Sequence, residues 1–323
     1  MNPLTEMQKT RPEKRALLLA IVWLVVISLA RFQLTSGGQT SEHLKIGYLP
    51  ITCHLLLPIA MERDEFFKRH VEPIKFTSWP DMIEAVKGGR LDCALILAPI
   101  AISLAAQRVP IEVALLGHRN GTGLVVARGG PIHGPRDFEG KTVAIPIRFS
   151  TQNLALLSFL EDSGVDIQKV TRVELPPPDM PSALASGAID AYIVGEPYAT
   201  QSVLAGTGVI LRDIREIWPN FISSILIVRK DALDGKRAKL DTLIRGLYNQ
   251  GKWIDNHRAE AARIGARFFG LSPKLIGAVL LGGKVSYEDI LPREEEFSQI
   301  ASRMKRHHLL EHVPRLEIYR GWK

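Results

Sequence analysis

One stretch of sequence occurs twice in this chain, and the repetition decides the fold. Residues 177–199 read PPDMPSALASGAIDAYIVGEPYA, and residues 79–101 read WPDMIEAVKGGRLDCALILAPIA. Eight of the 23 aligned positions are identical, and most of the others exchange one apolar residue for another. Each copy holds a helix start, a short helix, a glycine, an aspartate, an apolar run and a proline. This order predicts a helix that leads into a buried strand, built once in each of two similar α/β units.

The two copies differ where the strand ends. Glu196 and Tyr198 in the second copy stand where the first copy has Ala98 and Ile100. Because the first copy forms its strand without a carboxylate, we assign Glu196 to ligand specificity rather than to the fold. The aspartates that both copies keep are expected to be architectural. They are Asp92 and Asp190, which precede the strands, and Asp81 and Asp179, which are expected to cap the helices.

Apolar runs and helical patterns alternate on both sides of the repeat. Such alternation predicts open, mainly parallel sheets flanked by helices. We expect strands at residues 44–49, 73–79, 92–99, 111–117, 124–128, 142–147, 170–176, 190–197 and 223–230. We expect helices at residues 55–70, 81–86, 100–107, 150–164 and 179–187, and a helical C-terminal part from residue 238 onward.

Two segments carry the chain between the units. Residues 129–141 are rich in Gly and Pro, and residues 219–224 lead into a strand that we expect to return to the first unit. The sequence therefore predicts a first domain of residues 43–130 and 222–323 and a second domain of residues 138–218, with hinges near the two crossings. Ligands bind beyond the carboxyl ends of the strands in such sheets, so two facing sheets make a cleft.

The composition is that of a globular protein of about two domains. The chain has 323 residues, of which 46% are apolar and 23% charged, and its net charge is +7. No basic run with interleaved aromatic residues concentrates this charge, so we expect no nucleic-acid partner. Cys53 and Cys93 are expected at opposite ends of neighbouring strands, too far apart for a disulfide. No C-x-x-C spacing indicates a metal site, and we predict none.

The N-terminal segment differs from the rest of the chain. Four basic residues precede an uncharged apolar run at residues 16–30, and a polar stretch follows. This pattern predicts that residues 1–30 are a signal peptide cleaved after Ala30, or that residues 16–30 stay as a membrane anchor. The run is short for a helix that spans a bilayer, which needs about 20 residues.

Three motifs resemble one family of receptors. They are GYLPIT (47–52), GGRLDCALILAP (88–99) and the stretch at residues 177–199, whose phrase G-x-I-D-A-x-x-V-G-E-P is the most specific. They resemble the periplasmic substrate-binding proteins of ABC transporters for nitrate, bicarbonate, sulfonates, taurine and thiamine-pyrimidine precursors. The resemblance covers residues 43 to 300. Receptors of the nitrate and bicarbonate type often carry Trp after the Pro, where this chain has Tyr198.

The resemblance implies a fold, a place and a set of partners. The fold is the type II periplasmic-binding-protein clamshell, and the location is periplasmic or otherwise extracytoplasmic. The function is capture of a small anionic or zwitterionic solute for an ABC permease and its ATPase, without a cofactor. Two alternatives stay open. One is an enzyme on the same fold, of the pyrimidine-precursor synthase or menaquinone-pathway dehydratase type. The other is a ligand sensor tethered to the membrane.

Candidate ligand-binding residues follow the ends of the predicted strands. Arg148 offers a guanidinium that can pair with an oxyanion, and Ser150 and Thr151 add hydroxyls at a helix start. Glu196 needs a partner, for which Arg148, Arg119, a ligand donor or a cation are candidates. No catalytic residue is predicted. The complete set is Thr52, Cys53, His54, Trp79, Pro99, His118, Arg119, Asn120, Arg148, Ser150, Thr151, Glu196 and Tyr198.

Overall fold

The computed structural model describes residues 17, 19–28 and 43–323, and the chain divides into the units Met1–Glu42 and His43–Lys323. In the first unit, residues 17 and 19–28 are helical, and their large apolar side chains are exposed. None of the helices in the described part of the chain has the length and apolar character needed to cross a membrane. The predicted cleavage position after Ala30 lies outside the described residues.

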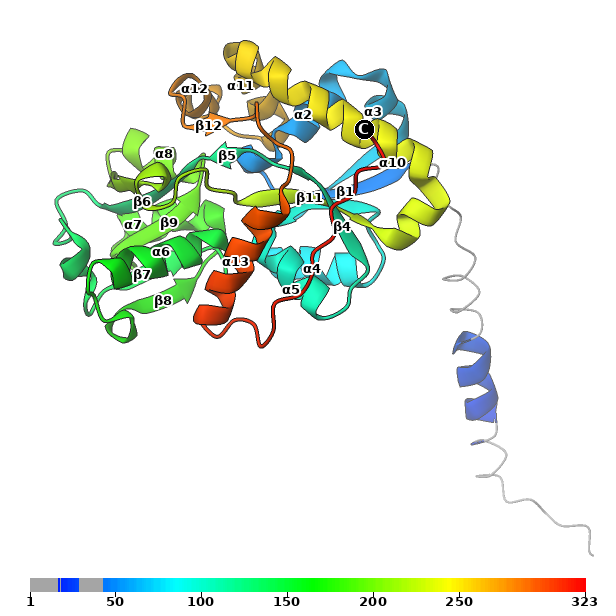
Figure 1. The fold of residues 1–323 in the computed structure, drawn as a ribbon, viewed down its shortest axis with the longest axis horizontal. Helices are drawn as coiled ribbons and strands as arrows, with labels where there is room; N and C mark the ends of the chain where they lie inside the picture. Colours follow the sequence, from blue (N-terminus) through cyan, green and yellow to red (C-terminus); the bar gives the residue numbers. More distant parts are fainter. Residues whose placement is uncertain (1–16, 18, 29–42) are drawn as a thin grey trace, which may run out of the picture. The chain divides into compact units, whose positions relative to one another are not determined.

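Two five-stranded sheets organise the second unit (Figure 1). In each sheet four strands run parallel and one strand, next to an edge strand, runs antiparallel. The first sheet has the order β2 (Val71–Lys75), β1 (Leu44–Tyr48), β3 (Cys93–Leu97), β11 (Ser224–Arg229) and β4 (Ile111–Leu116). The second sheet has the order β10 (Gly208–Asp213), β6 (Thr122–Ala127), β9 (Ala191–Gly195), β7 (Thr142–Ile145) and β8 (Thr171–Glu174).

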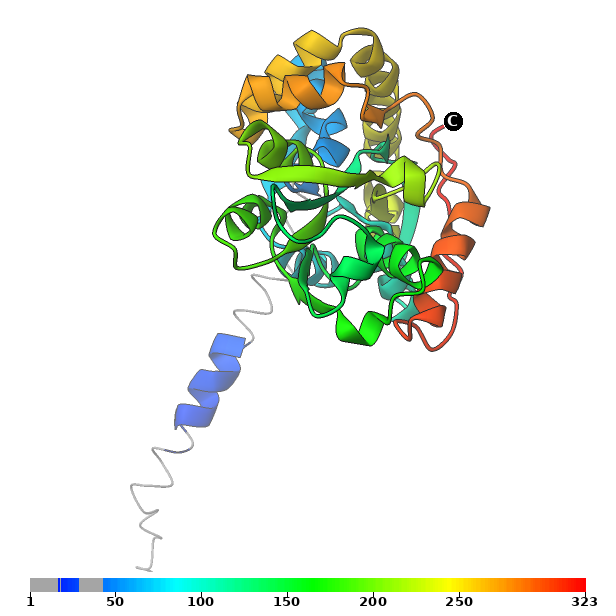
Figure 2. The same cartoon turned by 90° about the vertical axis from the view of Figure 1, so that its left-hand side faces the viewer.

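Helices cover the sheets, as the alternating pattern predicts (Figure 2). The helices that connect strands are α2 (Leu56–Arg63), α3 (Glu65–His70), α4 (Trp79–Lys87), α5 (Ala98–Ala106), α6 (Thr151–Asp162), α7 (Met180–Ala185), α8 (Tyr198–Leu204) and α9 (Ile214–Ile217). The C-terminal part holds α10 (Lys230–Asn256), α11 (Arg258–Phe269), α12 (Pro273–Leu281) and α13 (Glu294–Arg306). A small third sheet joins β5 (Arg119–Asn120) to β12 (Val285–Ser286). Short 3₁₀-helices are η1 (Thr52–His54), η2 (Pro135–Phe138), η3 (Ile167–Lys169) and η4 (Pro177–Asp179).

The antiparallel strand of the first sheet is β11, which lies between β3 and β4. The chain therefore leaves the first sheet after β4, builds the second sheet between residues 122 and 213, and returns to complete the first. The return near residues 219–224 was expected, but the excursion begins before residues 129–141, because β6, which was predicted within the first domain, lies in the second sheet. The domain boundaries themselves stay a prediction.

The two copies of the repeated sequence form the same hydrogen bond at their aspartates. The Asp92 carboxylate accepts from the Lys45 amide at 2.8 Å, and the Asp190 carboxylate accepts from the Thr142 amide at 2.8 Å. Each aspartate thus holds the start of the neighbouring parallel strand, β1 or β7. Its role is architectural, as predicted, because it joins two neighbouring strands. At Gly89 and Gly187, which end the two helices, φ is +68° and +75°, a region that favours glycine.

Three local predictions were wrong. The predicted helix at 55–70 is two helices, because Asp64 adopts an extended conformation and caps α3 through the Phe66 amide at 2.9 Å. The cap of α4 is Ser78, not Asp81, which lies inside the first turn. Asp179 precedes α7 but makes no side-chain capping bond there. Ser and Asp are both favoured at the cap and in the first turn of a helix, so the sequence alone did not distinguish Ser78 from Asp81 as the cap of α4.

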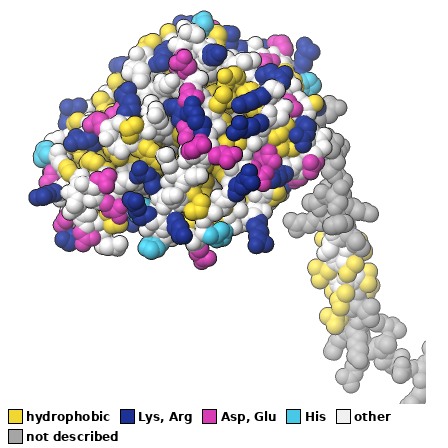
Figure 3. Space-filling model, viewed as in Figure 1, with side chains coloured by type: hydrophobic (Ala, Val, Ile, Leu, Met, Phe, Trp, Pro, Cys, Tyr) yellow, Lys and Arg dark blue, Asp and Glu magenta, His cyan; other side chains and the backbone are white. Residues whose placement is uncertain are grey.

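The distribution of charged side chains on the surface agrees with the sequence, in which no run of basic residues occurs. On the face shown in Figure 3, Lys and Arg side chains are interspersed with Asp and Glu. Charges of both signs on one face give a solvated surface rather than a strongly positive field.

Candidate functional site

The carboxyl ends of the two sheets meet, and the contacts between them are direct. The Thr52 amide donates to the Glu196 carbonyl at 3.0 Å, and the Tyr198 hydroxyl donates to the Pro50 carbonyl at 3.1 Å. The Gln152 side-chain amide donates to the Ser223 hydroxyl at 2.8 Å. These contacts join the segments after β1 and before β11 to those after β7 and β9. The carboxyl ends of the parallel strands in both sheets therefore face one another, at the edges where such sheets bind ligands in other proteins.

Three of the buried polar atoms that have no hydrogen-bond partner among the residues that the structure describes belong to side chains that open helices at this junction. They are Trp79 Nε1, Thr151 Oγ1 and Gln152 Oε1. Their side chains are 2% exposed or less. Trp79 opens α4 beyond the end of β2, whereas Thr151 and Gln152 open α6 beyond the end of β7. Buried polar atoms are nearly always paired, so three such atoms at strand ends define a candidate site for a polar ligand.

A helix start supports the same location. Ser150 caps α6, because its hydroxyl accepts from the Asn153 amide at 3.1 Å and donates to the Ile147 carbonyl at 2.7 Å. The Ser150 hydroxyl thus already has backbone partners for both its donor and its acceptor function. Thr151, the next residue, keeps its hydroxyl free of protein partners in the described part of the chain. The partial positive charge of the α6 N-terminus favours an anion or the anionic end of a zwitterion.

His54 is a neutral, buried residue that shapes the junction. Its Nδ1 lies 2.8 Å from the Leu49 amide, which donates to it, and its Nε2 lies 3.3 Å from the Ser224 hydroxyl. The His54 ring meets the Trp79 ring edge-on at 6.0 Å. Burial lowers the pKa of His54 to about 3, since a charged imidazole would lose its hydration. His54 therefore packs against Trp79 and carries no charge at neutral pH.

His118 and Cys53 are likewise uncharged. Burial lowers the pKa of His118 to about 4, and its Nε2 lies 3.3 Å from the Thr52 hydroxyl. Burial raises the pKa of the Cys53 thiol to about 11, so the sulfur stays protonated. Tyr287 donates its hydroxyl to the Thr52 carbonyl at 2.8 Å, which fixes the turn that carries these residues.

Glu196 is fully engaged by protein groups. Its carboxylate accepts from the Thr200 amide at 2.9 Å and from the Thr200 hydroxyl at 2.8 Å, and it pairs with Lys284 at 3.1 Å. The Lys284 ammonium also donates to the Thr200 hydroxyl at 2.6 Å. The expectation that Arg148 or Arg119 pairs with Glu196 was therefore wrong. The partner is a lysine 88 positions further along the chain.

The remaining candidates are divided between the junction and other places. The Arg119 guanidinium pairs with Asp289 at 3.1 Å and with Glu296 at 2.8 Å. Arg148 is exposed, with its guanidinium 5.0 Å from the ring centre of Phe149. Asn120, in β5, has a φ of 64°. Pro99 is buried in the first turn of α5.

Two residues of the junction were not predicted from the sequence. Gln152 follows Thr151 in the segment that drew attention to Ser150 and Thr151, so its amide was an available signal. Lys284 follows two glycines in a segment without a recognisable motif. Its role depends on a contact far away in sequence, which a single chain does not reveal.

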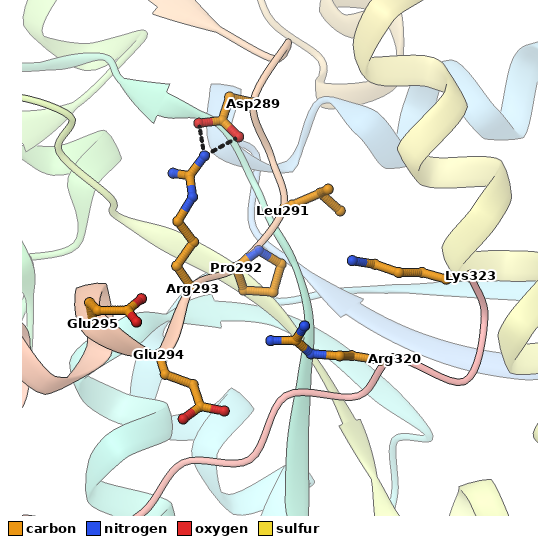
Figure 4. A pocket seen from close by; sticks show the side chains of 8 residues that line it. All are labelled: Asp289, Leu291, Pro292, Arg293, Glu294, Glu295, Arg320 and Lys323. Carbon is orange, nitrogen blue, oxygen red and sulfur yellow. Dashed lines mark hydrogen bonds and ion pairs between the residues drawn. The ribbon is translucent and has the colours of Figure 1, made fainter.

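A surface hollow of about 450 Å³ lies apart from this junction (Figure 4). Arg320 and Lys323 face it from the C-terminal segment, while Arg293 pairs with Asp289 at its rim. Three basic and three acidic side chains line the hollow, so its charges balance. Within residues 17, 19–28 and 43–323, no group of three His, Cys, Asp or Glu side chains is arranged to hold a metal ion.

Known proteins of similar sequence or structure include ATP-binding proteins of transport systems and periplasmic binding proteins. The nitrate import ATP-binding protein NrtC of Synechocystis is 27% identical over 255 residues, which cover 72% of this chain and 38% of that protein. The taurine-binding periplasmic protein of Escherichia coli is 32% identical over 160 residues, 49% of each chain. The crystal structure of the periplasmic nitrate-binding protein NrtA from Synechocystis PCC 6803 superposes with a TM-score of 0.77 at 18% identity, covering 84% of this chain and 82% of that one.

These matches differ in what they cover. This chain spans 38% of NrtC and 32% of the bicarbonate transport ATP-binding protein CmpC of Synechocystis, so it corresponds to a part of each. The NrtA structure confirms the periplasmic-binding-protein fold that the resemblance implied. The model of the NMT1-like family matches residues 37–268, well over half of the sequence. The chain therefore belongs to the NMT1-like family.

Proposed function

We propose that this protein is the solute-binding receptor of an ABC uptake system and works outside the cytoplasm. It captures a small anionic or zwitterionic solute between the carboxyl ends of its two sheets and delivers it to a permease driven by an ATPase. The observation that carries the proposal is the group of unpaired buried atoms Trp79 Nε1, Thr151 Oγ1 and Gln152 Oε1. They come from both sheets, so a solute that satisfies them holds the sheets together.

The charges at the junction define what the solute meets. His54 and His118 are neutral, and Lys284 is already paired with Glu196. The solute is therefore met by two neutral groups that can donate, Trp79 Nε1 and Thr151 Oγ1, by one acceptor, Gln152 Oε1, and by the N-terminus of α6. The donors and the helix N-terminus suit the oxygens of a small anionic group, and the acceptor suits a hydroxyl or ammonium group of the same solute.

The same residues favour binding over catalysis. Cys53 is a thiol whose pKa is raised to about 11, which makes it a weak nucleophile at neutral pH. The low pKa values of His54 and His118 make them weak general bases. We infer that the protein binds its solute without transforming it.

Titration with candidate solutes tests the proposal. Nitrate, bicarbonate, taurine, an alkanesulfonate and formyl-aminopyrimidine are each added to the purified protein, and heat and thermal unfolding are measured. At least one should bind and raise the unfolding temperature. If none of them does either, the proposed function is wrong for this solute class.

Variants locate the binding site. Trp79→Phe removes one unpaired donor, whereas Gln152→Leu removes the unpaired acceptor together with the amide that donates to Ser223. Both should weaken binding about tenfold or more. Trp322→Phe is the matched control, because Trp322 Nε1 is also buried without a partner in the described residues but packs on Tyr248 near the C-terminus. Its affinity should equal that of the wild type. Equal losses in Trp79→Phe and Trp322→Phe would contradict the assigned site.

The N-terminal segment has its own test. We propose that residues 1–30 direct export and are removed. Mass spectrometry of protein isolated from its host membrane and periplasm should then find a chain that begins near Arg31. An intact N-terminus in the membrane fraction would instead support the tethered sensor.

A further inference from the structure

Lys284 and Glu196 form an ion pair between two parts of the molecule that are built separately. Glu196 directly follows β9 of the second sheet, and Thr200 lies in α8, the next helix. Lys284 lies between α12 and β12. Helix α12 packs on α11, and α11 packs on α2, which follows β1 of the first sheet. The pair therefore links the second sheet to the C-terminal helices that cover the first.

The repeat shows that the fold does not require this carboxylate. Ala98 occupies the position of Glu196 in the first copy. The Ala98 amide donates to the Ser223 carbonyl at 2.9 Å, and the Glu196 amide donates to the Gly121 carbonyl at 2.8 Å. In each copy the strand end is thus held by the antiparallel neighbour, through the backbone. The Glu196 carboxylate is therefore not part of the hydrogen bonding that the two copies share.

Burial gives the pair its strength. Glu196 is 2% exposed, and the Lys284 side chain is 24% exposed. A buried carboxylate that loses its cationic partner is strongly destabilised, unless water reaches it. Water reaches Glu196 when the sheets separate, so the pair favours the arrangement in which they touch.

We propose that Lys284 and Glu196 are a latch that holds the two sheets together around the solute and sets how long the solute stays bound. The proposal rests on the proposed function and assigns to Lys284 a positioning role. The Glu196 carbonyl, held by the Thr52 amide and hydroxyl at 3.0 and 2.9 Å, is the neutral part of the same contact. Solute contacts and latch are thus separate groups: the solute meets Trp79, Thr151 and Gln152, and the latch closes beside them.

The test compares Lys284→Met with a control variant, Lys236→Met, in which the broken ion pair lies beside the first sheet and does not join the two sheets. Lys236 pairs with Asp92 at 3.0 Å, and both side chains are about as buried as Lys284. Stopped-flow dissociation of each solute that binds is measured for wild type, Lys284→Met and Lys236→Met. We expect Lys284→Met to speed dissociation about tenfold, by the same factor for every solute, and Lys236→Met to leave it unchanged. The double variant Glu196→Gln/Lys284→Met should dissociate as fast as Lys284→Met but regain folding stability.

A second measurement does not depend on any solute. Cysteines placed at Lys274 of α12 and Ser186 after α7, both exposed, carry spin labels, since the native Cys53 and Cys93 are 1% exposed. The distance distribution in the solute-free protein should shift to longer distances in Lys284→Met and stay unchanged in Lys236→Met. If no solute binds the wild type, the proposed function fails and this distance alone decides on the latch.

Two results would overturn the latch. One is unchanged dissociation and unchanged distances in Lys284→Met. The other is a loss of affinity that varies strongly between solutes of different charge, which would mean that Lys284 touches the solute.

Discussion

At the scale of single residues, His54 and His118 make the stability of the protein depend on pH. Their folded-state pKa values of about 3 and about 4 lie below the ordinary value of 6.5. Below pH 6.5 the unfolded chain binds protons that the folded protein does not, so the free energy of unfolding falls as the pH drops toward 4. At pH 5 the loss is about 2 kcal/mol for each histidine. Urea unfolding at pH 7.5 and pH 5 measures it.

Variants separate the histidines from the carboxylates that titrate in the same range. His54→Gln/His118→Gln should show a smaller loss of unfolding free energy between pH 7.5 and pH 5 than the wild type. His133→Gln, at an exposed histidine, should behave like the wild type. An unchanged pH dependence in the double variant would mean that the two imidazoles bind protons in the folded state.

Residue roles were predictable where local sequence defines them and not where a distant contact does. The comparison of Glu196 with Ala98 identified a position that the fold leaves free, and the structure places an ion pair there. The identity of the partner, Lys284, depends on how α12 packs, which no local pattern encodes. Arg148 illustrates the converse: its charge made it a candidate, but its side chain is exposed.

At the scale of elements, the start of α6 separates a structural hydroxyl from a binding one. Ser150→Ala removes the cap of the Asn153 amide and should lower the free energy of unfolding by about 1 kcal/mol. Thr151→Val removes a hydroxyl that has no protein partner in the described residues and keeps the side-chain shape. It should leave stability nearly unchanged and weaken solute binding. Urea unfolding and calorimetric titration of both variants measure the two effects.

The opposite pattern would contradict these assignments. If Ser150→Ala lost affinity beyond its lost stability, or Thr151→Val unfolded the protein, the two hydroxyls would have the reverse roles.

Strand and helix positions near α6 were predictable, because buried parallel strands are continuous apolar runs. The break at Asp64 and the cap at Ser78 were not, since several neighbouring residues could begin each helix.

At the scale of the whole molecule, the unit His43–Lys323 should fold without the preceding residues. A chain of residues 43–323 should unfold over the same range of urea concentration as the full chain. It should also bind the same solutes with the same affinity. Both sheets and their hydrophobic contacts lie within this unit. Failure of the shorter chain to fold would show that residues 1–42 contribute to the core.

The place of β11 has a consequence for how the protein is made. The five strands of the second sheet lie between residues 122 and 213, so all of them are translated before β11 and leave the ribosome before β11 emerges. Until residues 224–229 emerge, β3 and β4 lack the strand that joins them, and the nascent first sheet keeps two unpaired edges. Synthesis thus completes the later-encoded sheet first and closes the earlier one around its last strand.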